Sequence, residues 1–306
     1  MDRDIVVLGS LNVDFVVRVS KRPGRGETVF GKGFTIFPGG KGANQAVAVG
    51  RLGGNVCMAG RIGDDVFSGI LLDSLSGANV GTENIITTKG IFTGSAFITV
   101  EDTGENYIVV VPGANWRCSK ADVDELLPCI RTAKILMLQL EIPLETVVYA
   151  AQVARSCGVM VMLDPAPASS LPPDLYRLID VITPNEHEAS LLTGEQVCDV
   201  HSARRAAIDL VAKGARNAVV KLGAMGAVYC SSQGDCGYIK GHAVDVVDTT
   251  AAGDAFSGGL AVALCEGKTL AESCRFANAA GALSVTREGA QTSMPSRNEL
   301  ARLYEV

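Results

Sequence analysis

The sequence predicts an α/β fold: a doubly wound, mainly parallel sheet flanked by helices, with a small β-sheet lid. Short apolar runs typical of strands buried on both faces alternate along the chain with helical patterns, which indicates a parallel sheet. Two further stretches, at about residues 13–38 and 93–112, contain strand-like runs without helices between them. We expect these two stretches to form the lid on the main sheet.

The elements follow this order along the chain. Ile5–Leu8 is a short apolar run that ends at Gly9, as a buried strand would. The stretch from Gly40 to Gly53 is rich in small residues and reads as a helix, and Asp102-Thr103-Gly104-Glu105 is typical of a hairpin turn. Further strands are expected at Val56–Ala59, Ile135–Leu138, Val159–Leu163, Val181–Thr183 and Ala218–Leu222, and further helices at Leu144–Arg155 and Ala203–Lys213.

Length and composition indicate one domain. The chain has 306 residues, of which 47% are hydrophobic, enough to bury a full core. Because no linker, repeat or low-complexity segment interrupts the pattern, we expect a single domain over residues 1–306 from which the lid extends.

Charge and cysteine usage limit the classes of partner. The formal net charge of −6 argues against nucleic acid, and no apolar run approaches the roughly 20 residues of a membrane span. The nine cysteines are scattered without a Cys-x-x-Cys pair, and the start of the chain lacks an export signal. We therefore expect reduced thiols and a cytoplasmic location.

The run from Asp248 to Asp254 is the strongest chemical signal. Ala251, Ala252 and Gly253 are small residues at the expected start of a helix, where free backbone N–H groups and the helix dipole attract an anion. A carboxylate at Asp254 is unexpected beside an anion site, unless it accepts a proton from a hydroxyl while the N–H groups neutralise a transferring phosphoryl group. This combination predicts a kinase that acts on an alcohol.

Two polar stretches near the amino terminus are candidates for substrate binding. Asn12 and Asp14 are two residues apart, so in an extended chain they share one side and could hold vicinal hydroxyls; an Asn/Asp turn explains them equally well. Gly39-Gly40-Lys41-Gly42 precedes a helix and would allow close approach to a ligand, although a glycine-rich turn with a solvated lysine fits the same residues.

Two later stretches could serve a nucleotide. Asn185 and Glu188 are one helical turn apart and could hold Mg²⁺ mostly through water, or could form a helix capping box; the two interpretations are compatible. Lys221 to Gly226 could expose backbone to a nucleotide or simply form a hairpin turn. A P-loop is excluded, because Val262 stands where Gly267-Lys268-Thr269 would require glycine.

Taken together, the motifs resemble the ribokinase family, the carbohydrate kinases with a phosphofructokinase-B-type signature. The resemblance extends over nearly the whole chain, with its motifs in order, and is specific because many short motifs agree. The stretches that carry it are Gly9–Asp14, Gly39–Ala46, Gly113–Asn115, Leu138–Glu141, Asp164–Pro167, Thr183–Glu186, Asp248–Phe256 and Val285–Gln291.

The resemblance implies a role for each matching position. Asp254 would be the base, with Ala251, Ala252 and Gly253 as the anion hole. The sugar would be held by Asn12, Asp14, Gly40, Lys41, Asn44 and Glu141, and the nucleotide by Asn185, Lys221, Gly223, Gly226 and Asn278. Glu188 would act on Mg²⁺ indirectly, and a monovalent cation, expected to be K⁺, would be held mainly by carbonyl oxygens of Asp248, Thr250, Ser284, Arg287, Gly289 and Ser293.

The implied activity is ATP-dependent phosphorylation of a sugar, with ribose converted to ribose 5-phosphate as the leading expectation. Asn12 favours ribose, because similar deoxyribose kinases tend to lose this residue. Deoxyribose, a ketose or a nucleoside remain alternatives, and a non-catalytic sugar-binding regulator is a weaker one. The resemblance also implies a homodimer whose contact is formed by the lid.

Overall fold

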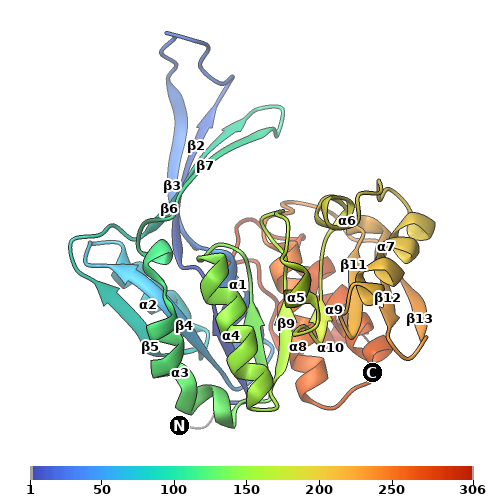
Figure 1. Ribbon diagram of the computed structural model, residues 1–306. Helices are drawn as coiled ribbons and strands as arrows, with labels where there is room; N and C mark the ends of the chain where they lie inside the picture. Colours follow the sequence, from blue (N-terminus) through green and yellow to red (C-terminus); the bar gives the residue numbers. More distant parts are fainter. Residues whose placement is uncertain (1–2, 305–306) are drawn as a thin grey trace.

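The protein, described here from a computed structural model covering residues 3–304, has a three-layer α/β/α body from which a smaller sheet projects (Figure 1). Within these residues, nine strands form the main sheet. Their order across the sheet is β13 (Cys236–Lys240), β12 (Gly226–Ser231), β11 (Asn217–Lys221), β10 (Val181–Ile182), β9 (Met160–Leu163), β8 (Ile135–Leu138), β1 (Ile5–Leu8), β4 (Val56–Gly63) and β5 (Gly81–Thr88).

The direction of the strands confirms the doubly wound, mainly parallel fold. Neighbours from β11 to β5 run parallel, and only the β11–β12 and β12–β13 pairs of this sheet are antiparallel. The chain proceeds from β1 to β4 and β5 on one side and later fills the other side from β8 onward. The order therefore reverses between β1 and β8, and a crevice is expected beyond the carboxyl ends of these two strands.

Helices cover both faces of the main sheet. One face is covered by α1 (Lys41–Arg51), α2 (Ser68–Gly77), α8 (Ala252–Cys265), α9 (Leu270–Ser284) and α10 (Arg297–Tyr304). The other is covered by α3 (Lys120–Thr132), α4 (Leu144–Ser156), α5 (Pro173–Tyr176), α6 (Glu186–Thr193) and α7 (Val200–Ala212). The 3₁₀ helices η1 (Gly113–Arg117) and η2 (Gly223–Met225) lie in the connections.

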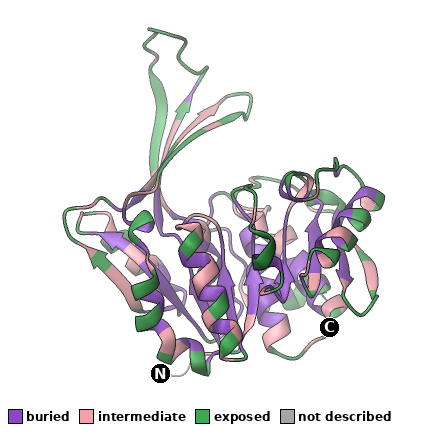
Figure 2. Cartoon of the chain, in the orientation of Figure 1, coloured by how far each residue is buried: buried purple, intermediate pink, exposed green. Residues whose placement is uncertain are grey.

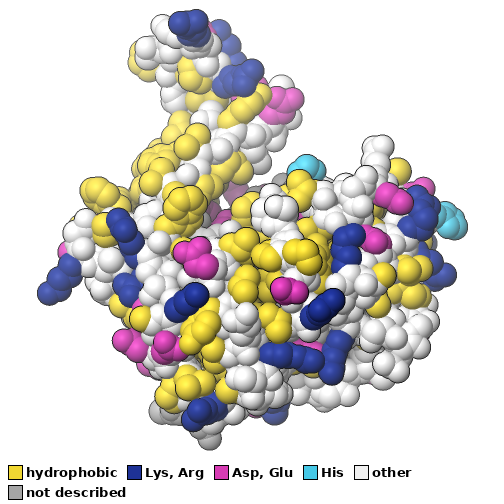
Figure 3. Space-filling model, viewed as in Figure 1, with side chains coloured by type: hydrophobic (Ala, Val, Ile, Leu, Met, Phe, Trp, Pro, Cys, Tyr) yellow, Lys and Arg dark blue, Asp and Glu magenta, His cyan; other side chains and the backbone are white. Residues whose placement is uncertain are grey.

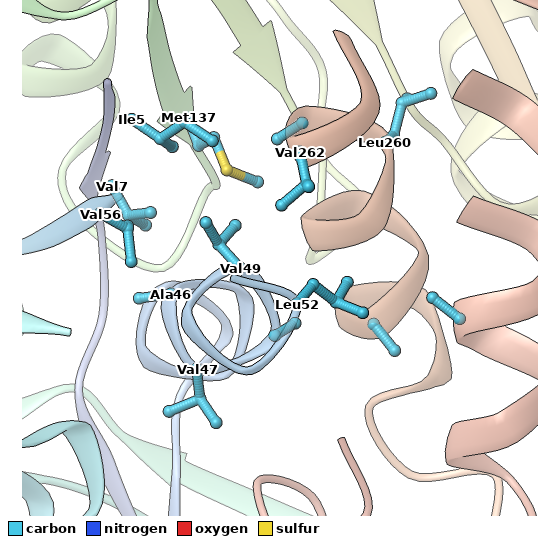
Figure 4. Packing of buried hydrophobic residues seen from close by; sticks show 14 of the residues in the cluster. Ile5, Val7, Ala46, Val47, Val49, Leu52, Val56, Met137, Leu260 and Val262 are labelled. Carbon is cyan, nitrogen blue, oxygen red and sulfur yellow. The ribbon is translucent and has the colours of Figure 1, made fainter. Parts of the chain in front are cut away.

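The alternation of side chains along each buried strand separates two hydrophobic cores. Ile5 and Val7 of β1 pack in the core that contains α1 and α8, whereas Val6 and Leu8 pack in the core that contains α3 and α4. Figure 4 shows the first of these cores, where side chains of α1 such as Val49 lie between the sheet and α8. Burying each such side chain contributes about 1.5–3 kcal/mol, so the two cores fix the frame that carries the site.

A second sheet forms from the stretches between β1 and α1 and between β5 and α3. In the described chain it has four strands, in the order β3 (Gly31–Gly39), β2 (Asn12–Val19), β6 (Gly94–Glu101) and β7 (Asn106–Val111). β2 and β6 are parallel and the other pairs antiparallel, with the expected hairpin joining β6 to β7. Its base is joined to the body, and its far end is largely exposed (Figure 2).

The cysteines correct one expectation. Cys230 and Cys236 lie directly opposite each other on the antiparallel strands β12 and β13 and are joined by a disulfide. The prediction that all nine cysteines are reduced is therefore wrong for this pair, because a hairpin brings the two together. In residues 3–304, no helix is long and apolar enough to cross a membrane.

Candidate active site

The candidate site lies at the carboxyl ends of the central strands, where the sheet topology predicts a crevice. Ser10 follows β1, Gln139 follows β8, Asp164 follows β9 and Lys221 ends β11. The amino termini of α1 and α8 face the same region and supply the other polar residues. A cavity of about 860 Å³ opens here, lined among others by Lys41, Asp164, Asn185, Glu188, Lys221, Gly223, Gly226, Asn278 and the run from Ala251 to Asp254.

The start of α8 has the geometry of an anion site. Ala251 precedes the helix in a left-handed conformation, with φ 59° and ψ 13°, which is uncommon for a residue other than glycine. This turn lets the helix begin abruptly at Ala252. The N–H groups of Gly253 and Asp254 have no acceptor within the helix, because they belong to its first turn. The helix dipole adds positive potential at the same point.

Asp254 lies buried at this helix start. One carboxylate oxygen accepts a hydrogen bond from Asn44 Nδ2 at 2.9 Å, and the other accepts one from Gln45 Nε2 at 3.1 Å. Burial raises the pKa of the Asp254 carboxyl; the nearby Lys41 charge and the two amide donors oppose this rise, whereas Asp164 adds to it. A fixed carboxylate with an elevated proton affinity suits a general base.

Lys221 places a positive charge beside the same helix start. Its ammonium donates to Asp164 Oδ1 at 3.0 Å, and a Cβ built on Gly253 would lie 3.3 Å from Lys221 Nζ. The cation and the first-turn N–H groups of α8 therefore converge on one point. Such a convergence can stabilise the charge of a transferring phosphoryl group.

The residues expected to hold the sugar gather near Asp254. Asn12 lies in β2 and its Oδ1 accepts from Asn115 Nδ2 at 2.7 Å, so the chain here is extended and is not the alternative turn. Glu141 accepts from the Lys41 backbone N–H at 3.0 Å and from the Ser10 hydroxyl at 2.5 Å. Gly40 has φ 88°, and a Cβ there would lie 2.7 Å from the Asn12 nitrogen, so this close approach requires glycine.

The charges of this region are tightly coupled. Burial, together with the neighbouring Glu141 and Asp254 carboxylates, raises the pKa of Asp14 to about 7. Burial alone would lower the pKa of Lys41, but Asp254, Asp164, Glu141 and Glu188 together raise it, so Lys41 stays charged. Among the described residues, none donates a hydrogen bond to the Asp14 carboxylate. Asp14 is therefore free to accept from a ligand hydroxyl.

The nucleotide candidates line the cavity on the side of β11, β12 and α9. The glycines of the β11–β12 connection have positive φ, 51° at Gly223 and 102° at Gly226, and a Cβ at Gly226 would lie 2.1 Å from the Ile239 carbonyl oxygen. The hairpin interpretation is thus correct, and the turn still faces the cavity. Asn278 lines it too, with its Nδ2 bound to the Lys240 carbonyl at 2.8 Å.

Asn185 and Glu188 form a capping box at the start of α6. The Asn185 side chain accepts from the Glu188 N–H at 2.8 Å, and Glu188 accepts from the Asn185 N–H at 2.8 Å and from its side-chain amide at 3.0 Å. Burial, together with the Asp164 charge, raises the pKa of Glu188. Because both residues also line the cavity, a cap and an outer role at a metal ion are compatible.

The residues proposed for a monovalent cation come together from two segments. Asp248 accepts from the Thr250 N–H at 2.9 Å and from the Gly289 N–H at 2.9 Å, which joins the segment before α8 to the loop after α9. These hydrogen bonds lower the pKa of Asp248 despite its partial burial. The Arg287 side chain points away from Asp248, and its Nη2 donates to Glu299 Oε1 at 2.7 Å. The hydroxyls of Ser284 and Ser293 each donate to a backbone carbonyl three residues earlier in the chain.

Sequence reasoning assigned no role to several residues that the structure places in the site. Ser10 binds Glu141, Asn115 binds Asn12, and Asp164 binds Lys221. Gln45 and Gln139 lie beneath Asp254. All of them stand in or beside the motifs that carry the resemblance, and this position was the only signal that could have indicated them.

Comparison with known proteins agrees with this geometry. Residues 2–297 match the family described as pfkB family carbohydrate kinases. The chain is 44% identical to a ribokinase of Haemophilus influenzae (100% of this chain, 99% of the relative) and 35% identical to a deoxyribokinase of Salmonella typhi (96% of each chain). A solved Arabidopsis thaliana ribokinase, complexed with ribose and ATP, superposes with a TM-score of 0.94 at 34% identity and 100% coverage of both chains.

Proposed function

The chain belongs to the pfkB family of carbohydrate kinases, and from this premise we propose that it transfers the γ-phosphoryl group of ATP to O5 of D-ribose. The observation that carries the proposal is the meeting of a buried carboxylate, Asp254, with the open start of α8 and the Lys221 ammonium. The similarity to ribokinases, including one complexed with ribose and ATP, supports the choice of both substrates.

The proposed reaction assigns a separate task to each group. The O5 hydroxyl donates to Asp254, which takes its proton as the oxygen attacks the γ-phosphorus in line. The N–H groups of the first turn of α8 and the Lys221 ammonium neutralise the phosphoryl oxygens. Asn12, Asp14 and Glu141 hold the sugar hydroxyls, and Lys41 balances the surrounding carboxylates. Catalysis would then come mostly from positioning and electrostatic stabilisation.

The donor sets fit the two metal ions expected for this family. The pKa of Asp248 is lowered, which keeps its carboxylate ionised, and this charge together with carbonyl oxygens of Thr250, Ser284, Arg287, Gly289 and Ser293 would make an oxygen-only set that suits K⁺. Glu188 uses both carboxylate oxygens within the capping box, so it would reach Mg²⁺ only through water. Mg²⁺ would supply charge neutralisation on the phosphates when bound.

The remaining assignments are part of the same proposal. The small sheet, from segments 13–38 and 93–112 of a single domain, would close over the sugar as a lid and form the contact of a homodimer. Gly223, Gly226 and Asn278 would lie along the nucleotide. The cytoplasm is the proposed location.

Deoxyribose is the second candidate substrate, because a deoxyribokinase is among the relatives. A site built to pair with a hydroxyl rejects a sugar that lacks it, since buried polar groups are left without a partner at a cost of about 1–3 kcal/mol each. Asn12, already oriented by Asn115, is the residue placed to make this distinction. Ribose should therefore be preferred by roughly ten- to a hundredfold in kcat/KM.

A substrate panel with an Asp254→Asn variant tests the proposal. ADP release is measured with ribose, deoxyribose, a ketose and adenosine, and ribose binding by calorimetry. We expect ribose to be the preferred substrate, and the variant to lose about 100- to 10,000-fold in kcat while still binding ribose. More than a tenth of the parent turnover in the variant would exclude Asp254 as the base.

A further inference from the structure

Two buried glutamines lie beneath Asp254. Gln45 belongs to α1, and Gln139 follows β8; their exposed fractions are 1% and 0%. A buried primary amide needs partners for two donors and one acceptor, so its environment determines which way it points.

The side-chain nitrogen of Gln45 bridges two carboxylates. Gln45 Nε2 lies 3.1 Å from Asp254 Oδ1 and 2.9 Å from Asp164 Oδ2. One NH₂ group has two hydrogens, so it can donate to both acids at once. Because Asp164 is also bound to Lys221, an unbroken path of hydrogen bonds runs from Lys221 through Asp164 and Gln45 to Asp254.

Gln139 determines the orientation of Gln45. Its Nε2 donates to Gln45 Oε1 at 2.7 Å, which leaves only the nitrogen of Gln45 to face the acids. The reversed amide would place its oxygen against two carboxylates and is disfavoured by charge. Gln139 Oε1 has no hydrogen-bond partner among the described residues and occupies the space beside Gly9, where a Cβ would lie 2.0 Å from it.

We propose that Gln45 is a positioning residue for Asp254, and that Gln139 fixes Gln45 in the donating orientation. The inference rests on the proposed role of Asp254 as the base. Gln45 keeps the second carboxylate oxygen in place while Asn44 holds the first, so the carboxylate cannot rotate away from the sugar. Its donated hydrogen bond also opposes the effect of burial on the pKa of Asp254.

The variant Gln45→Leu has nearly the same volume as the parent side chain and removes both donors. We expect kcat to fall roughly ten- to a hundredfold, the range for losing a hydrogen bond to a charged group. The acid limb of the kcat–pH profile should move upward by about one pH unit, because the ionised base loses a donor. The KM for ribose should stay within about threefold, since Gln45 does not touch the sugar in this mechanism.

Gln139→Leu provides a second test that leaves the Gln45 donors in the chain. It should lower kcat and raise the acid limb of the kcat–pH profile, as Gln45→Leu does, but by a smaller amount. The reason is that Gln45 can then rotate and donates to Asp254 only part of the time. Thr146→Val is the control: it removes one buried hydrogen bond, from Thr146 Oγ1 to the Cys118 carbonyl at 2.9 Å, on the opposite face of the sheet. Its kcat and pH profile should match those of the parent.

The outcomes separate this inference from the proposed function. If Asp254→Asn is inactive but folded Gln45→Leu keeps the parent kcat and acid limb, Gln45 is not a positioning residue. The same conclusion holds if Gln45→Leu loses the same fraction of its activity at every pH and its KM for ribose rises by a similar factor. If Gln45→Leu does not fold, an unshifted acid limb in Gln139→Leu overturns the inference. If Asp254→Asn itself stays active, the proposed base is wrong.

Discussion

Asp14 illustrates, at the scale of a single residue, how a binding site can reduce stability. It is partly buried beside Glu141 and Asp254, and its pKa is raised from 3.8 to about 7. No described donor pairs with its carboxylate, so its charge is stabilised only when a ligand hydroxyl arrives. The folded protein without sugar therefore carries an unfavourable charge above pH 7.

We predict that Asp14→Asn stabilises the protein at alkaline pH while it weakens ribose binding. The folded pKa lies above the unfolded one, so the parent's stability is fully present below about pH 4 and falls as pH rises towards 7. An amide does not titrate and avoids this loss. The variant should gain about 1–3 kcal/mol at pH 8 and little at pH 4, as measured by urea unfolding at both values.

Asp73→Asn is a suitable control for this prediction, because Asp73 is an exposed carboxylate of α2. It should change stability little at either pH. An Asp14→Asn variant with the same gain at pH 4 and pH 8 would show that the effect does not come from titration of Asp14.

Single residues differ in how far the sequence reveals them. The sequence alone points to Asp254 as the proposed base, because a carboxylate next to Ala251, Ala252 and Gly253 has few purely structural explanations. Gln45 was not, because its role depends on Asp164 and Gln139, which other strands bring to it. Asn185 and Glu188 stay ambiguous from spacing alone, since a capping box and an outer metal contact use the same residues.

At the scale of elements, apolar runs and helical periodicity predicted most of the parallel strands and some of the helices between them, namely α1, α4 and α7. The hairpin from β11 to β12 was one of two interpretations of Lys221–Gly226, but the second hairpin, from β12 to β13, was not predicted, although the residues between Cys230 and Cys236 include Gly234 with φ 87°, which is typical of a tight turn. The disulfide was missed because the hairpin that brings its two cysteines together was not predicted. Spacing alone does not show that two cysteines six residues apart lie opposite each other.

The small sheet exposes apolar side chains that the body does not cover (Figure 3). Phe15 stacks on Phe97 with ring centroids 5.2 Å apart, and Phe34 and Phe97 remain 60% and 50% exposed. Val109, on the edge strand β7, is 64% exposed. An apolar sheet with an open edge is expected to pair with another copy of itself.

We predict that Val109→Lys weakens the proposed dimer without unfolding the body. A charge on the edge strand opposes burial against a second copy. Light scattering should give a mass near twice 31.9 kDa for the parent and a shift towards one chain for the variant. The KM for ribose should rise if the dimer contact supports the lid.

Ile208→Lys is the matched control, because Ile208 is 51% exposed on α7, away from the small sheet. It should leave the mass unchanged. The proposed lid contact would be overturned if the unmutated protein is monomeric both at the concentration of the enzyme assay and at millimolar concentration.

At the scale of the whole molecule, the segment from Val247 to Asp254 connects distant parts of the fold. Val247 donates to the Val285 carbonyl at 2.8 Å, and Asp248 accepts from Gly289, so the segment is held by the loop that follows α9. Its other end is the start of α8, the proposed anion site. Any ligand that orders the Asp248 loop should therefore affect phosphoryl transfer without touching either substrate.

We predict that K⁺ activates the enzyme more than Na⁺ does. A bound ion would hold the carbonyls of both segments and fix the left-handed turn at Ala251, and coupling of this kind typically changes affinity or rate about five- to a hundredfold. K⁺ is the ion that the family resemblance implies for this loop. The measurement is kcat/KM for ribose and for ATP in K⁺-only and Na⁺-only buffers of equal ionic strength.

Asp248→Asn distinguishes an ion at this loop from a general effect of salt. The amide keeps an oxygen that can accept from Gly289 or Thr250 but removes the charge that attracts a cation, so activity should fall in K⁺ to near the Na⁺ level and lose its dependence on the ion. A variant that retains the parent's preference for K⁺ would place the ion elsewhere. Equal rates of the parent in both buffers would remove a monovalent ion from the mechanism and leave Asp248 as a residue that only joins the two segments.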